Sequence, residues 1–367
     1  MRFRAAVLRS YEKPFTVEEV VLRTGPAVGE ILVEIAGTGM CRTDLAVRRS
    51  AGRSPVPAVL GHEGAGVVVQ TGGGPDAAIG VGDHVVLSFD SCGYCRTCRG
   101  AAPAYCDSFA SLNLFGGRKE PPRLIDAAGK ALAPRWFGQS SFAEYALVSA
   151  RNAVRVDPAL PLELLGPLGC GALTGAGAVL NTFSAGPGDT LVVFGAGAVG
   201  LTAVMAATAA GVLTVAVDRH PERLVSAERF GAIPLSAASP DLSERIRRLT
   251  DGGAQYALDT TASPPLINKA LQALRPTGSL GLVARLHTPL ALEPGTLDRG
   301  RSVRHLCEGG AIPGVLIPRL IGLWRAGRFP FDQLIRTYPL AGINEAERDC
   351  DAGRVVKPVL LPERASR

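Results

Sequence analysis

The stretch Leu191-Val192-Val193-Phe194-Gly195-Ala196-Gly197-Ala198-Val199-Gly200 determines how the second half of the chain is expected to fold. Its four leading apolar residues predict a short buried strand, and the Gly-x-Gly-x-x-Gly spacing that follows predicts a sharp turn into a helix. A second apolar run, 213–217, ends in Asp218, about 20 residues beyond the turn. This order of strand, glycine turn, helix, strand and acidic residue is typical of a dinucleotide-binding site.

The glycines and the acidic residue have distinct expected roles in such a site. Glycine lets the backbone turn sharply and approach a pyrophosphate, which the free N–H groups of a helix N-terminus attract. A carboxylate at Asp218 favours NAD, because it would repel the 2′-phosphate of NADP. Arg219 lies beside it, and a guanidinium accommodates that phosphate, so NADP stays open as an alternative. A buried strand-to-helix turn with no cofactor is the other alternative.

The pattern of the chain changes at Asp189. Before about Ala150, short alternating segments such as 30–35 are separated by Gly and Pro, which indicates an all-β barrel or sandwich. After Asp189, strands alternate with helical stretches, which indicates a parallel sheet with helices on both faces. The tail from about Gly309 predicts one more helix and a final extended run. The sequence therefore predicts an all-β domain interrupted by an α/β domain, with the tail returning to the first.

Composition and charge exclude several classes of protein. The 367 residues are 47% hydrophobic and 20% charged, which argues against a disordered chain or a fibrous repeat. Lys+Arg exceed Asp+Glu by 39 − 33 = 6, but the basic residues are scattered, so neither nucleic acid nor a membrane is an expected partner. The uncharged stretch 190–217 is interrupted by glycines and is not expected to span a membrane. No secretion signal is evident, which favours a cytoplasmic protein.

Four of the eight cysteines are closely spaced, as Cys92-x-x-Cys95-x-x-Cys98 followed by Cys106. In a reducing compartment, cysteines more often serve metal binding or catalysis than disulfides. Four thiolates close a tetrahedral shell around Zn²⁺ and leave no open position, which predicts a structural zinc in a lobe at about 90–107. An iron–sulfur cluster is the main alternative.

A second set of metal-binding residue types is dispersed along the chain. Cys41 opens the segment 41–44, the pair His62-Glu63 lies between glycines, and so does Cys170. Taken singly, such a cysteine is more often a small buried residue, and such a histidine a satisfied core group. Taken together, two cysteines and a histidine hold a zinc ion with a fourth position open for water or substrate, which is the arrangement of a catalytic site.

With these motifs the chain resembles the zinc-dependent medium-chain alcohol dehydrogenases over nearly its whole length. The segments 137–143, 161–170 and 317–321 are similar to the aryl-alcohol (benzyl-alcohol) dehydrogenase subgroup, which also includes enzymes for allylic terpene alcohols. The resemblance implies hydride transfer between a primary aromatic or allylic alcohol, or its aldehyde, and NAD, with two zinc ions per chain. It also implies a homodimer or homotetramer.

The fold implied by the resemblance is α/β plus all-β, a GroES-like catalytic domain with an inserted Rossmann domain, whose doubly wound parallel sheet binds dinucleotides. The GroES-like domain is expected at 1–171 and 309–367, and the Rossmann domain at 172–308. Three other functions remain as alternatives: zinc chemistry on another alcohol or a specialised-metabolite carbonyl, with NADP in place of NAD; a zinc-free quinone or enoyl reductase; and a zinc-stabilised nucleic-acid-binding protein.

The resemblance also assigns roles around the catalytic zinc. Its implied ligands are Cys41, His62 and Cys170, with Glu63 beside the metal. Asp44 is implied as the acceptor for the ring N–H of His62, a contact that would fix which imidazole nitrogen faces the metal. The zinc ion would act as a Lewis acid that lowers the pKa of the alcohol.

Proton transfer is expected to begin at Thr43, which matches the position whose hydroxyl receives the proton of the alcohol and passes it to the nicotinamide ribose. In many relatives a histidine completes this relay to solvent. The matching residue here is Ala46, so a water molecule or a ribose hydroxyl is expected to finish the relay.

The cofactor contacts that the resemblance implies are Arg42, Thr174, Gly195, Gly197, Ala198, Val199, Gly200, Asp218, Arg219, Arg223, Val283 and Lys357. Among them, Arg42 and Lys357 match positions that contact the pyrophosphate, and Arg223 matches one near the adenosine ribose. Cys307 and Cys350 have no implied role and are expected only to pack.

The substrate pocket is defined least well. Phe89, Trp136 and Phe137 are candidates for an aromatic wall. Arg285 and His287 depart from the small, glycine- and proline-rich phrase that is common next to the nicotinamide carboxamide, so a standard pocket is in doubt.

Overall fold

A computed structural model describes residues 1–49, 55–74, 79–114, 122–133 and 135–363. The chain forms two compact units. The first consists of Met1–Cys170, Ile312–Pro318 and Asp332–Arg367, and the second of Gly171–Ala311 and Arg319–Phe331. Residues 309–311 and 319–331 therefore group with the second unit, whereas the sequence led us to expect the whole tail from 309 in the first.

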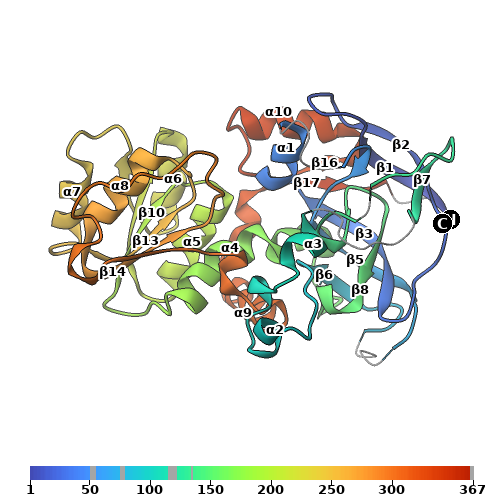
Figure 1. Cartoon of the computed structure of the whole chain (residues 1–367), viewed down its shortest axis with the longest axis horizontal. Coiled ribbons are helices and arrows are strands. Elements are labelled where there is room, and N and C mark those ends of the chain that lie inside the picture. The colour runs from blue at the N-terminus through green and yellow to red at the C-terminus, as the bar shows by residue number, and fades with distance from the viewer. Residues whose placement is uncertain (50–54, 75–78, 115–121, 134, 364–367) are drawn as a thin grey trace. The chain divides into compact units, whose positions relative to one another are not determined.

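The first unit is built on two mixed or antiparallel sheets. One has the strand order β4-β1-β2-β7, and the other has the order β16-β17-β3-β5-β6-β9, with β8 paired to β3 (Figure 1). Their bounds are β1 Arg2–Leu8, β2 Thr16–Leu22, β3 Glu30–Gly39, β4 Ala58–Val59, β5 Glu63–Thr71, β6 His84–Leu87, β7 Leu124–Asp126, β8 Tyr145–Ser149, β9 Ala153–Val156, β16 Ile335–Pro339 and β17 Lys357–Leu361. The all-β character expected before Ala150 is confirmed.

The central strand of this unit positions the metal-binding segments. β3 is buried along almost its whole length, and its side chains Ile31, Val33 and Ile35 belong to a core shared with β5, β6 and β8. β3 and β5 are antiparallel, with Gly39 opposite Glu63. Since β3 ends just before Cys41 and β5 begins just after His62, this register brings the two segments together.

Short helices connect the strands of the first unit: α1 Arg42–Arg49, α2 Arg96–Arg99, α3 Phe109–Asn113 and α10 Ile343–Asp351. The prediction of a single helix in the tail is wrong, because both α9 (Pro313–Arg325) and α10 form there. α10 has the sequence Ile-Asn-Glu-Ala-Glu-Arg-Asp-Cys-Asp, which is very polar. Two of its five buried residues are acidic, so the buried positions do not stand out as an apolar stripe: Ile343, Ala346, Glu347, Asp349 and Cys350.

Single helical turns fill many of the connections in both units. The 3-10 turns are Pro103–Tyr105, Trp136–Gly138, Ala150–Asn152, Leu162–Leu164, Gly166–Gly169, Asp298–Gly300, Glu308–Gly310, Phe331–Leu334 and Leu340–Gly342, and a π-helical turn spans Ala178–Thr182.

The second unit is a doubly wound sheet of six parallel strands in the order β12-β11-β10-β13-β14-β15. The strands are β10 Thr190–Phe194, β11 Leu213–Asp218, β12 Ile233–Ser236, β13 Ala254–Asp259, β14 Leu274–Leu282 and β15 Ser302–His305. The helices are α4 Gly171–Gly177, α5 Ala198–Ala209, α6 Pro221–Arg229, α7 Leu242–Leu249 and α8 Pro264–Ala273. This is the Rossmann order, whose direction reverses between β10 and β13 and leaves the ligand crevice there.

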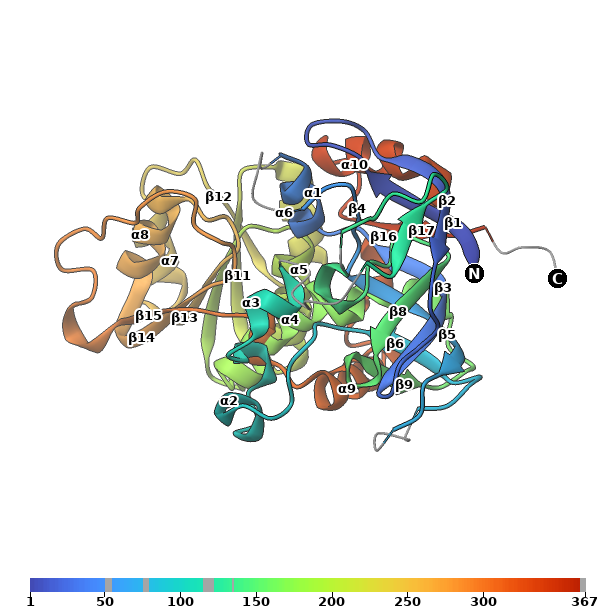
Figure 2. The ribbon, with the colours of Figure 1, turned by 45° about the vertical axis from the view of Figure 1, so that its right-hand side comes forward.

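Helices cover both faces of this sheet, as Figure 2 shows with α7 and α8 on one side and α5 and α6 on the other. Ile246 of α7 and Ile267 of α8 pack on Val192, Phe194 and the neighbouring strands in one buried core. The uncharged stretch 190–217 divides into β10, α5 and β11. In the part of the chain that the structure describes, no helix is both long enough and apolar enough to cross a membrane.

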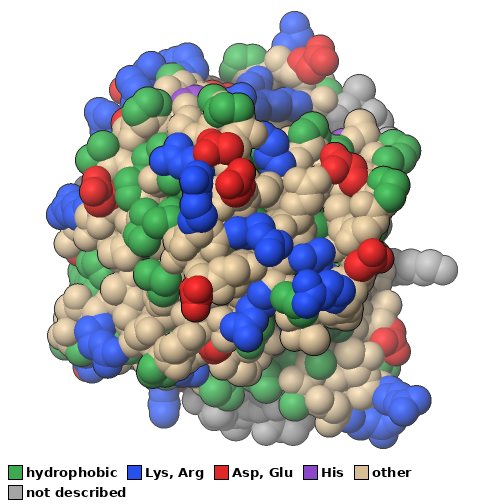
Figure 3. Space-filling model, turned by 90° about the vertical axis from the view of Figure 1, so that its left-hand side faces the viewer, with side chains coloured by type: hydrophobic (Ala, Val, Ile, Leu, Met, Phe, Trp, Pro, Cys, Tyr) green, Lys and Arg blue, Asp and Glu red, His purple; other side chains and the backbone are tan. Residues whose placement is uncertain are grey.

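Folding gathers some of the scattered positive charge on one face of the second unit (Figure 3). Burial, together with the nearby positive charges of Arg247 and Arg299, lowers the pKa of Arg301 below its ordinary value. These arginines come from α7 and from the loop before β15, so their separation along the chain hides the proximity.

Candidate active site

Four residues from three segments of the first unit converge on one point. One ligand atom from each of Cys41, His62, Glu63 and Cys170 lies within 4.8 Å of the others. Cys41 follows β3, His62 and Glu63 stand at the start of β5, and Cys170 follows a 3-10 turn. Three of the four side chains are buried and Cys41 is half-buried, so the group is shielded from most of the solvent.

The ring of His62 is held in one orientation. Its Nδ1 lies 2.8 Å from Oδ1 of Asp44, and its face stacks on Phe137 at 4.3 Å between ring centroids. Nε2 is buried and has no hydrogen-bond partner among the described residues. A buried imidazole nitrogen without a donor is costly unless a metal ion completes it, and Nε2 is therefore the expected ligand atom.

The charge balance of the group also suits a cation. Burial opposes the charged form of His62, but the negative charges of the Asp44 carboxylate and the Cys41 thiolate raise its pKa well above the ordinary value. The hydrogen bond from Cys170, together with the positive charge of His62, lowers the pKa of Cys41 despite its burial. Two thiolates and an imidazole match the donor set of a catalytic zinc, which keeps a fourth position open.

Two further polar residues hold the ligand segments in position. Gln139 donates from Nε2 to the carbonyl oxygens of His62 and Ser88, each at 2.9 Å. Ser88 donates from its hydroxyl to the carbonyl of Gly169 at 2.6 Å, next to Cys170. Both side chains are fully buried. The sequence contained Gln139 only as part of a matching segment, and nothing in its spacing indicated this role.

Lys357, which the resemblance implies as a pyrophosphate contact, has buried partners in this structure. Its Nζ donates to both carboxylate oxygens of Glu63, at 2.9 and 2.8 Å, and to the carbonyl of Met40 at 3.2 Å. These contacts use its three N–H donors, and the side chain is 5% exposed. Burial disfavours the ammonium, but Glu63 and Cys41 raise the pKa of Lys357. We infer that Lys357 neutralises Glu63 beside the metal-binding group.

The residues of the expected proton relay lie on α1. The Oγ1 of Thr43 is 3.6 Å from Sγ of Cys41, and its side chain is exposed. Ala46 lies one turn further along the helix and is also exposed. Arg42, the remaining expected cofactor contact on this helix, is exposed as well and is accessible to an anionic ligand.

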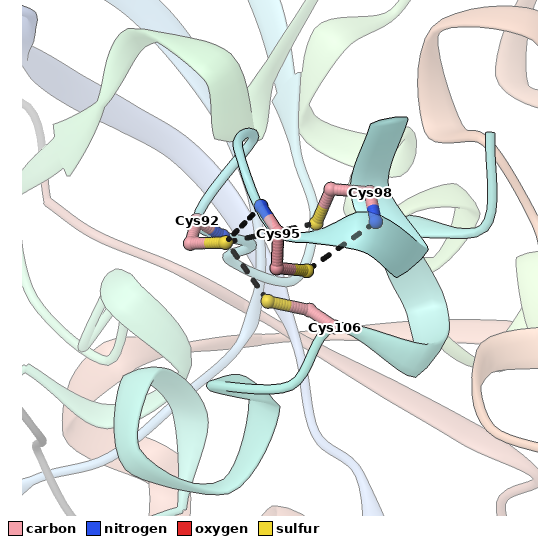
Figure 4. A group of neighbouring side chains, drawn as sticks. All are labelled: Cys92, Cys95, Cys98 and Cys106. Atoms are coloured by element: carbon pink, nitrogen blue, oxygen red, sulfur yellow. Dashed lines mark hydrogen bonds between the residues drawn. The ribbon is translucent and has the colours of Figure 1, made fainter. Parts of the chain in front are cut away.

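The four closely spaced cysteines form a second metal-binding group, with their sulfurs directed toward one another (Figure 4). Their sulfurs all lie within 4.8 Å of one another, and those of Cys92 and Cys98 are 3.9 Å apart. Backbone N–H groups point at the sulfurs, as from Cys95 to Cys92 and from Cys98 to Cys95, each at 3.3 Å. N–H groups of Asp107 and Cys98 lower the pKa of Cys95 to about 6.

This geometry fits a closed zinc site. Zn–S bonds of about 2.3 Å in a tetrahedron separate the sulfurs by slightly less than 4 Å, close to the observed spacing. All eight cysteines of the chain are free, so no disulfide competes for these thiols. Cys307 and Cys350, outside both groups, have raised pKa values because of burial, in keeping with packing roles.

In the second unit, the glycine turn has the geometry that a dinucleotide requires. Gly195 has a φ of +95°, and a Cβ there would lie 2.3 Å from Oγ1 of Thr260. A Cβ on Gly200 would lie 1.8 Å from the carbonyl oxygen of Gly195. Above Gly197, by contrast, a Cβ would meet no atom within 4 Å. This open position at the N-cap of α5, followed by Ala198 and Val199 in its first turn, suits close approach of a phosphate.

Asp218 is hydrogen-bonded to the glycine turn. Its Oδ2 accepts from the N–H of Ala196 at 2.7 Å, and its Oδ1 accepts from the N–H of His220 at 2.9 Å. Arg223 lies 3.9 Å from the same carboxylate. The guanidinium of Arg219 is exposed and donates to the ring of His220 at 3.0 Å.

The other expected cofactor contacts have partners within the second unit. Thr174 is buried and donates to Glu308 at 3.2 Å, and the N–H of Val283 donates to the carbonyl of Asp259 at 2.9 Å. Arg285 and His287 are exposed.

The proposed aromatic residues form one buried cluster in the first unit. Phe137 contacts Trp136 edge-on at 5.2 Å and Phe109 at 6.3 Å, and Phe109 contacts Phe89 at 5.8 Å. Because Phe137 also stacks on His62, the cluster begins at the metal-binding group.

Comparisons with known proteins identify the family of this chain. A model of the alcohol dehydrogenase GroES-like domain matches residues 27–158, and a model of zinc-binding dehydrogenases matches residues 198–318. The geraniol dehydrogenase of Castellaniella defragrans is 43% identical over 98% of this chain and 97% of its own length. This chain belongs to the zinc-binding alcohol dehydrogenase family.

Solved structures of alcohol dehydrogenases match this one along its whole length. An alcohol dehydrogenase zinc-binding domain protein from Burkholderia ambifaria has a TM-score of 0.95 and 43% identity, and covers 99% of this chain and 100% of its own. The benzyl alcohol dehydrogenase of Acinetobacter calcoaceticus has a TM-score of 0.91 and 38% identity over the same shares. This alcohol dehydrogenase is therefore an oxidoreductase, and its family implies zinc and a nicotinamide cofactor.

The open position above Gly197 gives a test of the cofactor site. Gly197→Ala should leave the free energy of unfolding within about 0.5 kcal/mol of the parent, because the new Cβ meets no protein atom. It should weaken dinucleotide binding at least about tenfold, since the Cβ occupies the space that a phosphate would approach. Calorimetric titration measures the affinity, with Gly186→Ala, also in open space, as the control. Unchanged affinity in Gly197→Ala would contradict this site.

The buried pair gives a second test. Lys357→Met should lower the free energy of unfolding by about 3 kcal/mol, because Glu63 would be left as an uncompensated buried charge. Urea denaturation measures the change, and Lys130→Met, at an exposed lysine, is the control. Adding Glu63→Gln should restore part of the loss. If Lys357→Met were as stable as Lys130→Met, the ion pair between Lys357 and Glu63 would make no stabilising contribution.

Proposed function

We propose that this alcohol dehydrogenase transfers a hydride between a primary aromatic or allylic alcohol, or its aldehyde, and NAD. The observation that carries the proposal is the group of two thiols and one fixed imidazole, with an unpartnered buried Nε2 on His62. The glycine turn with Asp218 at its edge supports the cofactor half of the proposal.

Each half of the reaction has its own chemistry. Zinc bound by Cys41, His62 and Cys170 would supply a Lewis acid at the open position, which favours loss of the alcohol proton. The nicotinamide ring would accept the hydride. Two protein residues prepare the metal-binding group. Asp44 fixes the orientation of the His62 imidazole, and Lys357 balances the charge of Glu63. The hydroxyl of Thr43, 3.6 Å from the Cys41 sulfur, is positioned to take the alcohol proton.

Two observations support aromatic or allylic alcohols as substrates. The relatives described above are a geraniol dehydrogenase and a benzyl alcohol dehydrogenase, and in both alcohols the hydroxymethyl carbon is attached to an unsaturated carbon. In this chain the aromatic cluster reaches the metal-binding group, because Phe137 stacks on His62. A flat unsaturated substituent packs well against such rings.

The carboxylate of Asp218 supports NAD over NADP. It is nine-tenths buried and anchored by two backbone N–H groups, so it cannot easily turn away from a 2′-phosphate. Arg219 is the feature that favours the alternative, NADP, because its guanidinium is exposed beside this carboxylate.

Metal content, assembly and location complete the proposal. Two separate groups of metal-binding side chains support two zinc ions per chain. The outermost strand β15 has mostly exposed residues, and such an edge supports pairing with a second copy in a homodimer or homotetramer. Free cysteines throughout the chain agree with a reducing compartment such as the cytoplasm.

One experiment tests the central claim. We expect about two zinc equivalents per purified chain, and turnover of benzyl, cinnamyl and geranyl alcohols with a kcat/KM at least about tenfold above short aliphatic alcohols. The rate is followed by absorbance of the reduced nicotinamide, with NAD and NADP compared for each alcohol. Fewer than two zincs, or no turnover with any alcohol, would overturn the proposal.

The relay gives a further prediction. Ala46→His should change the pH dependence of kcat, because it adds a titrating group one turn from Thr43 on the exposed face of α1. Ala46→Gln adds a side chain of similar size that does not titrate and should keep the parent profile. Identical profiles for the two variants would show that position 46 is not part of the relay.

A further inference from the structure

Trp136 donates a hydrogen bond into the support of the metal-binding group. Its indole Nε1 lies 2.8 Å from Oδ1 of Asp44, the same oxygen that is 2.8 Å from Nδ1 of His62. Asp44 has no exposed surface, and Trp136 is 6% exposed. A buried carboxylate of this kind must receive its stabilisation from protein donors, because water does not reach it.

The other donors to Asp44 all belong to the segments that carry metal ligands. They are Nδ1 of His62, the N–H of Gly61 at 3.2 Å, and the N–H of Cys41 at 3.2 Å. Of the four donors described, only the indole comes from elsewhere in the chain. Trp136 is therefore the contact that connects this carboxylate to a fixed point outside the ligand segments.

Trp136 is itself anchored by its own loop. Its backbone N–H donates to Oγ of Ser140 at 2.9 Å. Its backbone carbonyl accepts from the N–H groups of Gln139 and Ser140 at 2.9 and 3.0 Å. The following residue, Phe137, has a φ of +48° and lays its ring on His62. One short turn thus constrains the imidazole twice, through its face and through the carboxylate on Nδ1.

We propose that Trp136 is a positioning residue for the zinc-binding imidazole, acting through Asp44. The indole fixes the Asp44 side chain so that its Oδ1 stays on Nδ1 of His62 and leaves Nε2 directed at the metal. Partners that orient a ligating histidine in this way affect metal affinity about 10–100-fold when removed. The inference rests on the proposed function, because it requires zinc at this site. The zinc content of the parent protein, measured separately, tests that requirement.

The test compares the two tryptophans of the chain. Trp136→Phe keeps an aromatic ring but removes the N–H donor and some ring volume. Trp324→Phe, which loses the same atoms where the ring packs on Phe331 in a different part of the fold, is the matched control. Zinc transfer from the holoenzyme to an excess of a chromophoric chelator is followed over time. Zinc release from the catalytic site is the phase whose rate equals the rate at which alcohol oxidation is lost. The other phase of zinc release is assigned to the four-cysteine site.

We expect Trp136→Phe to release the catalytic-site zinc about tenfold faster, with the four-cysteine phase unchanged and Trp324→Phe equal to the parent. Equal release from Trp136→Phe and the parent would overturn the proposal. So would an equal acceleration of both phases, which is the result expected of general loosening of the fold rather than of a contact to His62.

A second measurement decides the matter if Trp136→Phe does not fold. The Trp324→Phe protein contains a single indole, whose N–H gives one resonance in ¹H–¹⁵N spectra of ¹⁵N-tryptophan-labelled protein. Because Trp136 and His62 share one carboxylate oxygen, removal of zinc should shift this resonance, and reloading should restore it. A resonance that does not move on zinc removal would show that the indole is not coupled to the metal.

Discussion

Close packing of backbone around Glu63 is the constraint on which the metal-binding group depends. A Cβ on Gly39 would lie 2.0 Å from a carboxylate oxygen of Glu63, and a Cβ on Gly166 would lie 2.0 Å from its carbonyl oxygen. Only glycine fits at these two positions, so β3, β5 and the turn before Cys170 approach more closely than side chains would allow. That approach brings two thiols, an imidazole and a carboxylate within reach of one ion. Gly39 and Gly166, two of the 44 glycines of the chain, thus serve the metal site rather than turns.

Features encoded by local spacing could be predicted from the sequence. The strand, glycine turn and Asp218 follow one another within a single unit of the parallel sheet, so their order along the chain is their order in space. The four-cysteine lobe is equally local, since its ligands lie in one connected loop and short helix. The dispersed ligands Cys41, His62 and Cys170 needed a resemblance to a known family before their convergence could be expected.

Contacts between distant segments were beyond such reasoning. Lys357 matches a pyrophosphate contact of the family, but its ion pair with Glu63, a buried carboxylate 294 residues away, gave no signal in the sequence. Trp136 was expected in a substrate wall because its ring is large, and its polar edge, bonded to Asp44, gave no signal in the sequence. α10 was missed because it is polar overall and buries only one narrow stripe. In each case burial, which spacing does not reveal, determines the role.

The contact between Lys357 and Met40 spans 317 residues, and β17 pairs directly with the end of β3 through Val359 and Gly39. The whole second unit and the tail segment Ile312–Pro318 of the first unit lie between these two strands in sequence. A ribosome must therefore release almost the entire chain before Glu63 acquires its counter-charge beside Cys41. The two metal-binding groups are therefore completed at different stages of translation. The four-cysteine lobe has its whole ligand set once Cys106 is made, whereas the other group has its ligands only after Cys170 and the counter-charge of Glu63 only after Lys357.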